Sequence, residues 1–140
     1  MSTPTRGERN NNPGDIERSN IVWLGQLPDS QATDPRFCQF DTPLHGIRAL
    51  CRVLLNYQRL DGVKTLEQMV ERFAPPNEND TAAYLADVAG YLGIAPDAAP
   101  ALTNTNELAQ VARAFILQEQ GRCVYSGDLI AQAAAMALQR

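Results

Sequence analysis

From residue 43 onward, apolar residues recur every three or four positions, which is the period of a helix with one buried face. The pattern predicts five helices, each with a recognisable start or stop signal. They cover about residues 43–60, 65–73, 80–92, 106–120 and 128–138. Thr42 and Pro43 mark the start of the first, Pro75 follows the second, and Gly93 and Gly121 stop the third and fourth.

Ahead of these helices the pattern is shorter and more strand-like. Residues 21–24 form an apolar run before Gly25, and Phe37 and Phe40 lie three positions apart, after Pro35. We therefore predict a small irregular hairpin or three-stranded lobe that is too small to be stable alone. Residues 1–9 are polar and predict a flexible arm, which leaves residues 10–140 as a single domain of the α+β class, mostly α.

The composition excludes several classes of partner and site. The 140 residues carry a net charge of −4 and a pI near 4.9, which argues against nucleic acid as a partner. Cys38, Cys51, Cys123 and the one histidine, His45, show no metal-ligand spacing, so we expect neither a metal site nor another cofactor. No apolar run is long enough for a membrane span and no signal peptide is evident, so synthesis in the cytoplasm is expected.

Glu119 is the most informative candidate for chemistry. The apolar stripe of the helix over residues 106–120 includes Leu108, Val111, Phe115 and Ile116, and its period continues directly onto Glu119. A carboxyl group on an apolar face is partly desolvated, which favours its protonated form and suits it to donate a proton near neutral pH. The alternative is that the helix frays at its last turn and leaves Glu119 in water.

Two polar loops are candidates for ligand contacts. Residues 10–14 combine three asparagines with Pro13 and Gly14, and we expect Gly14 to adopt a positive φ there. Such a run suits a sugar-binding loop, or it is a plain tight turn. Residues 75–81 form the second loop, after which Tyr84 faces either the core or a cleft. With one histidine and no phosphate-binding glycine loop, acyl transfer and phosphoryl transfer are disfavoured.

The chain resembles a group of phage-encoded proteins described as structural or virion proteins. Their pattern runs R-G-x-R-N-N-N-P-G-N-I, then W-x-G, F-x-x-F-x-x-P-x-x-G-I-R-A, A-P-P-x-E-N-D-T-x-x-Y and a late helix ending in E-N-G. The corresponding segments here are residues 6–16, 23–25, 37–49, 74–84 and 119–121. The resemblance covers most of the chain and implies a place in a phage particle, with other virion proteins as partners.

The middle of the chain is also similar to lysozyme-like glucosaminidases and lytic transglycosylases. Those enzymes carry their catalytic glutamate on an A-x-I-x-x-E-S-G helix before this portion, whereas the similar helix here ends at Glu119 near the other end of the chain. The resemblance implies a lysozyme-like fold in circularly permuted form, which is tolerable because the termini of domains often lie close together. Two positions depart from the family patterns, because Asp15 replaces an asparagine and Gln120 replaces the asparagine or serine after the acid.

The resemblance implies a peptidoglycan-degrading glycosidase in which Glu119 is the general acid and base on the bond between N-acetylmuramic acid and N-acetylglucosamine. A lytic transglycosylase needs no second carboxylate, whereas a muramidase does, with Asp15 or Glu17 as its candidates. The expected substrate contacts, by resemblance and polarity, are Asn12, Gly14, Gln39, Thr81 and Tyr84. Such an enzyme would act in the periplasm or cell wall. The alternative is a non-catalytic virion or assembly protein that keeps the fold as an interaction module.

Overall fold

The computed structural model describes residues 3–139 and is mostly helical. Within those residues there are six helices. They are α1 (Arg6–Arg9), α2 (Pro43–Leu60), α3 (Leu66–Phe73), α4 (Thr81–Leu92), α5 (Thr105–Gln120) and α6 (Gly127–Gln139). Helices α2 to α6 confirm the five predicted from the apolar periodicity, each to within one or two residues.

Local signals explain where these helices begin and end. Thr42 caps α2 by accepting a hydrogen bond from the backbone of His45, with Pro43 at the first helical position. Thr65 opens α3 with a reciprocal capping box, and Asn104 caps α5. Gly121 ends α5 with a φ of 75°, a left-handed conformation in which glycine has no steric penalty.

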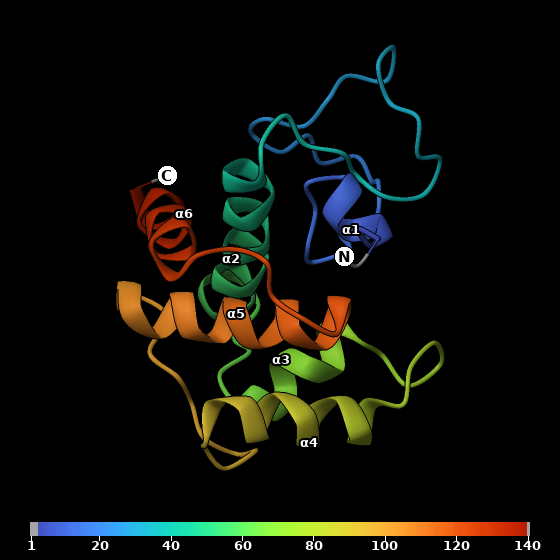
Figure 1. Cartoon of the computed structure of the whole chain (residues 1–140). Helices are drawn as coiled ribbons and strands as arrows, with labels where there is room; N and C mark the ends of the chain where they lie inside the picture. Colours follow the sequence, from blue (N-terminus) through green and yellow to red (C-terminus); the bar gives the residue numbers. More distant parts are fainter. Residues whose placement is uncertain (1–2, 140) are drawn as a thin grey trace.

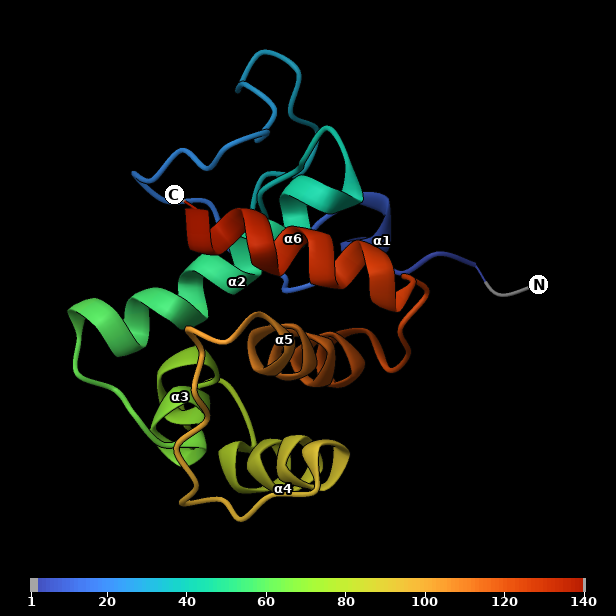
Figure 2. The ribbon, with the colours of Figure 1, turned by 90° about the vertical axis from the view of Figure 1, so that its left-hand side faces the viewer.

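Helix α5 lies in the middle of the molecule. Figures 1 and 2 show α4 and α3 on one side of it and α2 and α6 on the other, and α2 packs directly against both α5 and α6. The main core fills the spaces between these five helices. Its largest fully buried side chains are Phe115, Ile47, Leu50, Leu54, Leu55, Leu66, Met69, Leu102, Leu108, Ile116 and Ile130.

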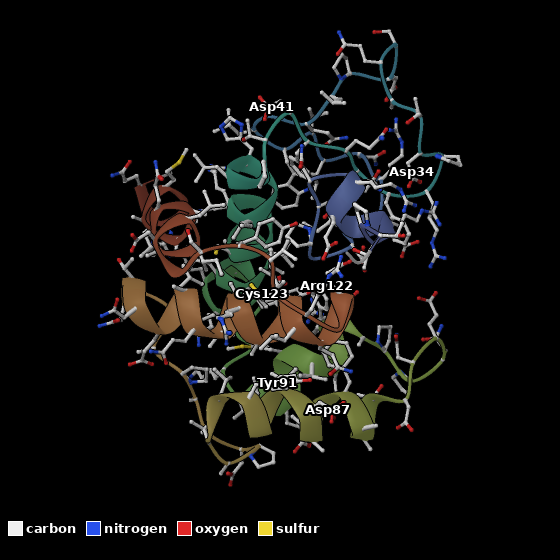
Figure 3. All side chains as sticks on the ribbon, viewed as in Figure 1. Asp34, Asp41, Asp87, Tyr91, Arg122 and Cys123 are labelled. Atoms are coloured by element: carbon white, nitrogen blue, oxygen red, sulfur yellow. The ribbon has the colours of Figure 1, made fainter. Side chains whose placement is uncertain are left out.

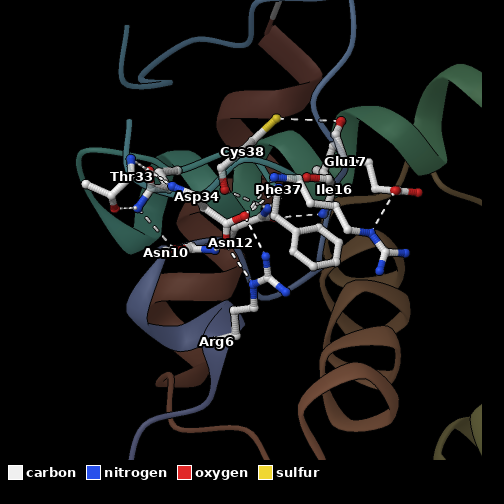
Figure 4. A network of polar contacts seen from close by, with 11 residues as sticks. Arg6, Asn10, Asn12, Ile16, Glu17, Thr33, Asp34, Phe37 and Cys38 are labelled. Carbon is white, nitrogen blue, oxygen red and sulfur yellow. Dashed lines mark hydrogen bonds and ion pairs between the residues drawn. The ribbon is translucent and has the colours of Figure 1, made fainter. Parts of the chain in front are cut away.

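Residues 3–42, here called the N-terminal lobe, contradict the prediction of a small β lobe. The described residues contain no strand, only two isolated antiparallel bridges that pair Glu17 with Phe37 and Gln26 with Phe40. In Figure 1 this lobe winds as an irregular loop beside the N-terminal half of α2. Sheet pairing does not extend because many backbone groups are bonded by side chains instead, as Figure 4 shows for the network around Asp34 and Asn12.

Asp34 is the charged centre of the N-terminal lobe. Its buried carboxylate accepts two hydrogen bonds from Arg6 at 2.7 and 2.8 Å, one from the amide of Asn10 and two from the backbone of Arg36 and Phe37. These donors hold the pKa of Asp34 far below its ordinary value, the Arg6 bond being the largest cause. A small second core of Cys38, Phe40 and Ala49 lies beneath this network.

The segment assigned to a flexible arm, residues 1–9, contains the short helix α1; residues 1 and 2 lie outside the described part of the chain. Thr5 and Glu8 form a capping box at the start of α1. Glu8 also receives a bidentate ion pair from Arg122, with distances of 2.6 and 3.0 Å, so this segment is tied to the end of α5. Figure 3 shows Arg122 between α1 and the C-terminal end of α5.

No helix in the described chain combines the length and the apolar character that crossing a bilayer requires.

Candidate functional site

A cavity of about 270 Å³ lies where the N-terminal lobe meets the C-terminal end of α5. Four parts of the chain enclose it: the turn at residues 14–17 with residues 36–37, the middle of α2, the α3–α4 loop, and Glu119. Its lining is largely polar at the N-terminal lobe and aromatic on the helical side. The lining side chains include Asp15, Glu17, Arg36, Phe37, Val53, Tyr57, Phe73, Glu78, Asn79 and Glu119.

Glu119 lies in the last turn of α5, half-buried, as the apolar stripe predicted. Its pKa is raised from 4.5 to about 8, mainly by burial and to a smaller extent by the adjacent carboxyl group of Asp15. The hydroxyl of Tyr84 donates a hydrogen bond of 2.7 Å to Oε2 of Glu119 and counteracts part of this rise. At neutral pH this carboxyl group therefore holds a proton, the state required of a general acid.

Tyr84 is positioned by an aromatic cluster. Its ring packs against Phe73 and Phe115, with centroid separations of 6.4 and 5.9 Å, and these two phenylalanines form an edge-to-face pair at 5.0 Å. The ring therefore belongs to the core, while the hydroxyl reaches Oε2 of Glu119. Of the two orientations open for Tyr84 in the sequence, the structure shows the one toward the core, because Tyr84 is buried and is not among the residues that line the cavity.

Asp15 lies beside Glu119 in the cavity lining and forms a hydrogen bond with it. Because Glu119 holds the proton, it is the donor and Asp15 the acceptor. Asp15 also accepts a hydrogen bond from the side-chain amide of Gln120 at 3.1 Å. Burial raises the pKa of Asp15, while the bonds from Glu119 and Gln120 and the positive charges of Arg6 and Arg36 lower it. The two carboxyl groups thus share one proton.

This contact bears on the choice of a second carboxylate. Retaining glycosidases separate their two carboxyl groups by about 5–5.5 Å and inverting ones by more, so that the scissile bond fits between them. Asp15 and Glu119 contact each other in this structure, so a scissile bond between them requires the two carboxyl groups to separate. Glu17 lies at the same cavity but is exposed and paired with Arg36 at 3.0 Å.

The asparagine-rich turn has a different conformation from the one predicted. Asn11 and Asp15, rather than Gly14, adopt positive φ angles, of 52° and 50°. Asparagine and aspartate tolerate this region better than other side chains do. Gly14 lies in the cavity lining but serves close packing, because an added Cβ would be 3.0 Å from a methyl carbon of Leu50 on α2.

Three of the expected substrate contacts have internal roles in the structure. Asn12 is fully buried, and its amide bonds the backbone of Ile16 in both directions and the carbonyl of Cys38. Gln39 joins Asn10 and Thr33 and accepts from the backbone of Thr33 and Asp34. Thr81 donates to the carbonyl of Ala74 and lines a separate groove beside α3. Asn12, Gln39 and Thr81 are not among the residues that line the Glu119 cavity.

Several residues of the cavity were not identified from the sequence. Tyr57 and Phe73 line it, and Arg36 reaches it from the N-terminal lobe, whereas Glu78 and Asn79 belong to the loop at residues 75–81 that the sequence had indicated for ligand contacts. Their helix or loop positions were predictable, but no local pattern indicates that segments so far apart in the chain converge. Within residues 3–139, no three histidine, cysteine, aspartate or glutamate side chains are grouped to hold a metal ion.

Comparison with known proteins places the chain among phage proteins. It matches no family model. It is 37% identical over 133 residues to Protein P5 of Pseudoalteromonas phage PM2, an alignment that covers 93% of this chain and 80% of that protein. The phage kinship expected from the sequence is thereby confirmed, while the lysozyme-like fold and its permutation stay predictions. By this extent and identity, the chain belongs to the family of Protein P5 of phage PM2.

Proposed function

We propose that this chain is a virion-associated phage protein that serves in assembly or as an interaction module. The supporting observation is its identity to a phage protein over most of both chains. The internal use of Asn12, Gln39 and Thr81 also favours a non-catalytic role, because these amides and this hydroxyl already have partners within the fold. The partners in this role are other proteins of the virion.

The test is whether the chain belongs to the particle. Virions are purified through a density gradient, and the chain is quantified by mass spectrometry against the major capsid protein in every fraction. The proposal expects a constant ratio of the two across the virion peak after a high-salt wash. If the chain stays in the soluble lysate and is absent from that peak, the virion role is wrong.

A second candidate function is favoured by one specific observation, the protonated Glu119 at a cavity. In this proposal the chain is a peptidoglycan lytic transglycosylase with a lysozyme-like fold in circularly permuted form. Glu119 donates its proton to the glycosidic oxygen and then removes a proton from the sugar's own 6-hydroxyl, which attacks the anomeric carbon. This route needs no second carboxylate across the cleft, in accord with the contact between Asp15 and Glu119.

Tyr84 would support this chemistry through its hydrogen bond to Oε2, which holds the carboxyl group of Glu119 in place. Asp15 would be a positioning residue. It would accept a hydrogen bond from the protonated carboxyl group of Glu119 until a bound glycan strand took its place. The protein would be made in the host cytoplasm and, carried by the virion, act on glycan strands in the periplasm or cell wall.

Zymography on purified peptidoglycan separates the two candidates. The proteins compared are the wild type, Glu119→Gln, and Glu78→Gln, a control that alters an exposed carboxylate at the same cavity. Catalysis predicts clearing by the wild type and the control only, with products that lack one water relative to hydrolysed ends. Equal clearing by all three, or none by any, contradicts an acid role for Glu119 and leaves the assembly role as the function.

A further inference from the structure

A groove of about 930 Å³ lies beside α3, and none of its lining residues belongs to the Glu119 cavity. Its walls come from the turn after α2, the outer face of α3 and the first turns of α4. Much of this lining is apolar, with side chains of Val63, Pro76, Ala82 and Leu85. The groove is therefore a second, separate place at which the chain can receive an apolar group.

The groove also carries net negative charge. Three carboxylates and one guanidinium line it. Arg72 neutralises Asp61, to which it donates a hydrogen bond of 3.0 Å. Glu67 and Glu71 are exposed one turn apart on α3, and neither forms an ion pair within the described chain. An occupant that complements this groove therefore presents a positive charge together with an apolar side chain.

The C-terminal end of α2 has that complementary chemistry and lies next to the groove. Leu60, the last residue of α2, is 75% exposed and directly precedes Asp61 of the groove lining. Arg59 is exposed as well, and no carboxylate among residues 3–139 pairs with it. Figure 2 shows this end of α2 projecting beyond α3 and α4. A cationic and apolar projection thus stands beside an acidic and apolar groove.

We propose that the groove receives the end of α2 from a second copy of this chain, so that two copies form a dimer with twofold symmetry. A twofold interface uses the same surface of both copies, so that surface must complement itself. In the dimer, Leu60 of each copy packs against Ala82 and Leu85 of the other. Arg59 of each copy meets the other copy's Glu67 and Glu71.

The position of Leu60 favours a second copy over a basic segment of a different protein. Such a segment would satisfy the charge of the groove, but it would leave Leu60 in water. A second copy covers the groove and Leu60 together, and it does so twice, because removing apolar surface from water is favourable at both symmetric contacts. Since the projection and the groove are side by side, both contacts form around one axis and the pair is closed.

The experiment measures the mass of the purified full chain by sedimentation equilibrium over a series of concentrations. Leu60→Ser removes the apolar projection, and Leu24→Ser is its matched control at another exposed leucine outside the groove. Arg59→Glu reverses the charge of the projection, with Arg113→Glu as its control at an exposed position outside the groove. A fourth variant, Glu67→Lys with Glu71→Lys, reverses the charge of the groove. Circular dichroism melts establish that every variant is folded.

The wild type and both controls should reach the mass of a dimer as concentration rises. Leu60→Ser should weaken the dimer at least about hundredfold, because the symmetry removes two buried leucines at once. Each charge-reversed protein should be a monomer when alone, since like charges then face each other. An equimolar mixture of the two should recover the dimer, because both contacts of the mixed pair join opposite charges.

Four outcomes overturn the proposal. They are a wild type that stays monomeric at its highest soluble concentration, a dimer that Leu60→Ser leaves unchanged, an equal loss in Leu24→Ser, and a mixture of charge-reversed proteins that stays monomeric. If the wild type is monomeric and a synthetic peptide of alternating lysine and leucine binds the groove, the occupant is a basic segment of another protein. Dimerisation does not depend on the virion role, since a dimer that is absent from purified virions would refute that role alone.

Discussion

Ionisation of the pair formed by Asp15 and Glu119 should make the stability of this protein fall as pH rises from 4.5 to about 8. Glu119 in the unfolded chain releases its proton near pH 4.5, whereas in the folded protein it does so near 8. Below pH 4.5 the carboxyl group of Glu119 is protonated in both the folded and the unfolded state, so it causes no loss of stability. Between the two values the unfolded state gains free energy from ionisation that the folded state does not, and above about 8 the loss is complete.

The size of this loss follows from the two pKa values. Their difference of about 3.5, multiplied by about 1.4 kcal/mol per pKa unit, gives an upper limit near 5 kcal/mol. The proton is shared with Asp15 and the site is only half-buried, so we expect a measured loss of about 2–5 kcal/mol. That is a large part of the about 5–15 kcal/mol that keeps a typical domain folded.

Glu119→Gln removes this pH-dependent loss of stability, because glutamine does not ionise. Its side-chain oxygen still accepts a hydrogen bond from Tyr84, and its amide can donate one to Asp15. Urea unfolding at half-unit intervals from pH 4.5 to 9 gives the free energy of unfolding of wild type, Glu119→Gln and the control Glu78→Gln. The variant should gain on the wild type steadily through this range, while the control follows the wild type. Parallel profiles for all three proteins would refute a buried, protonated Glu119.

Further predictions concern the N-terminal lobe. Asn12→Ala removes an amide with three buried backbone bonds and should cost about 2–5 kcal/mol in urea unfolding at pH 7, whereas a surface asparagine substitution should cost under about 0.5. Asp34→Ala leaves Arg6 and Asn10 unpaired and should abolish an acid transition. Because the pKa of Asp34 is lowered in the folded state, its ionised carboxylate stabilises the wild type fully above pH 3.8, the ordinary pKa, and progressively less at lower pH. In an acid titration followed by tryptophan fluorescence, only the wild type should therefore lose this stabilisation. Gly46→Ala would place a Cβ 1.6 Å from the carbonyl oxygen of Asn11, so its melting temperature should fall by well over about 10 °C, and an unchanged value would contradict this close approach.

The helices were predictable because their information is local. Thr42, Thr65 and Gly121 act within one turn of their own position, and apolar periodicity marks the buried face of each helix. The N-terminal lobe was not predictable in this way. Its order depends on Asp34 and Asn12, whose hydrogen bonds reach residues up to 28 positions away, so the short apolar runs suggested strands that do not form.

The candidate site was predictable only in part for the same reason. A break in an apolar stripe identified Glu119, and the polar loop before α4 drew attention to Tyr84, which does bond it. Asn12 and Gln39 were chosen for their polarity, which does not distinguish an amide that binds a ligand from one that completes a buried turn. Nothing near Gln120 indicates that its amide bonds the carbonyl of Pro13, 107 positions earlier.

The bonds between the N-terminal lobe and the end of α5 impose an order on biosynthesis. Glu8 and Asp15 are translated 114 and 105 residues before Arg122 and Gln120, to which they bind. The N-terminal lobe therefore lacks these two partners until α5 and the residue that follows Gly121 have been translated. Their many polar side chains suit that interval, because a nascent segment that stays hydrated is less prone to aggregate before the chain closes on itself.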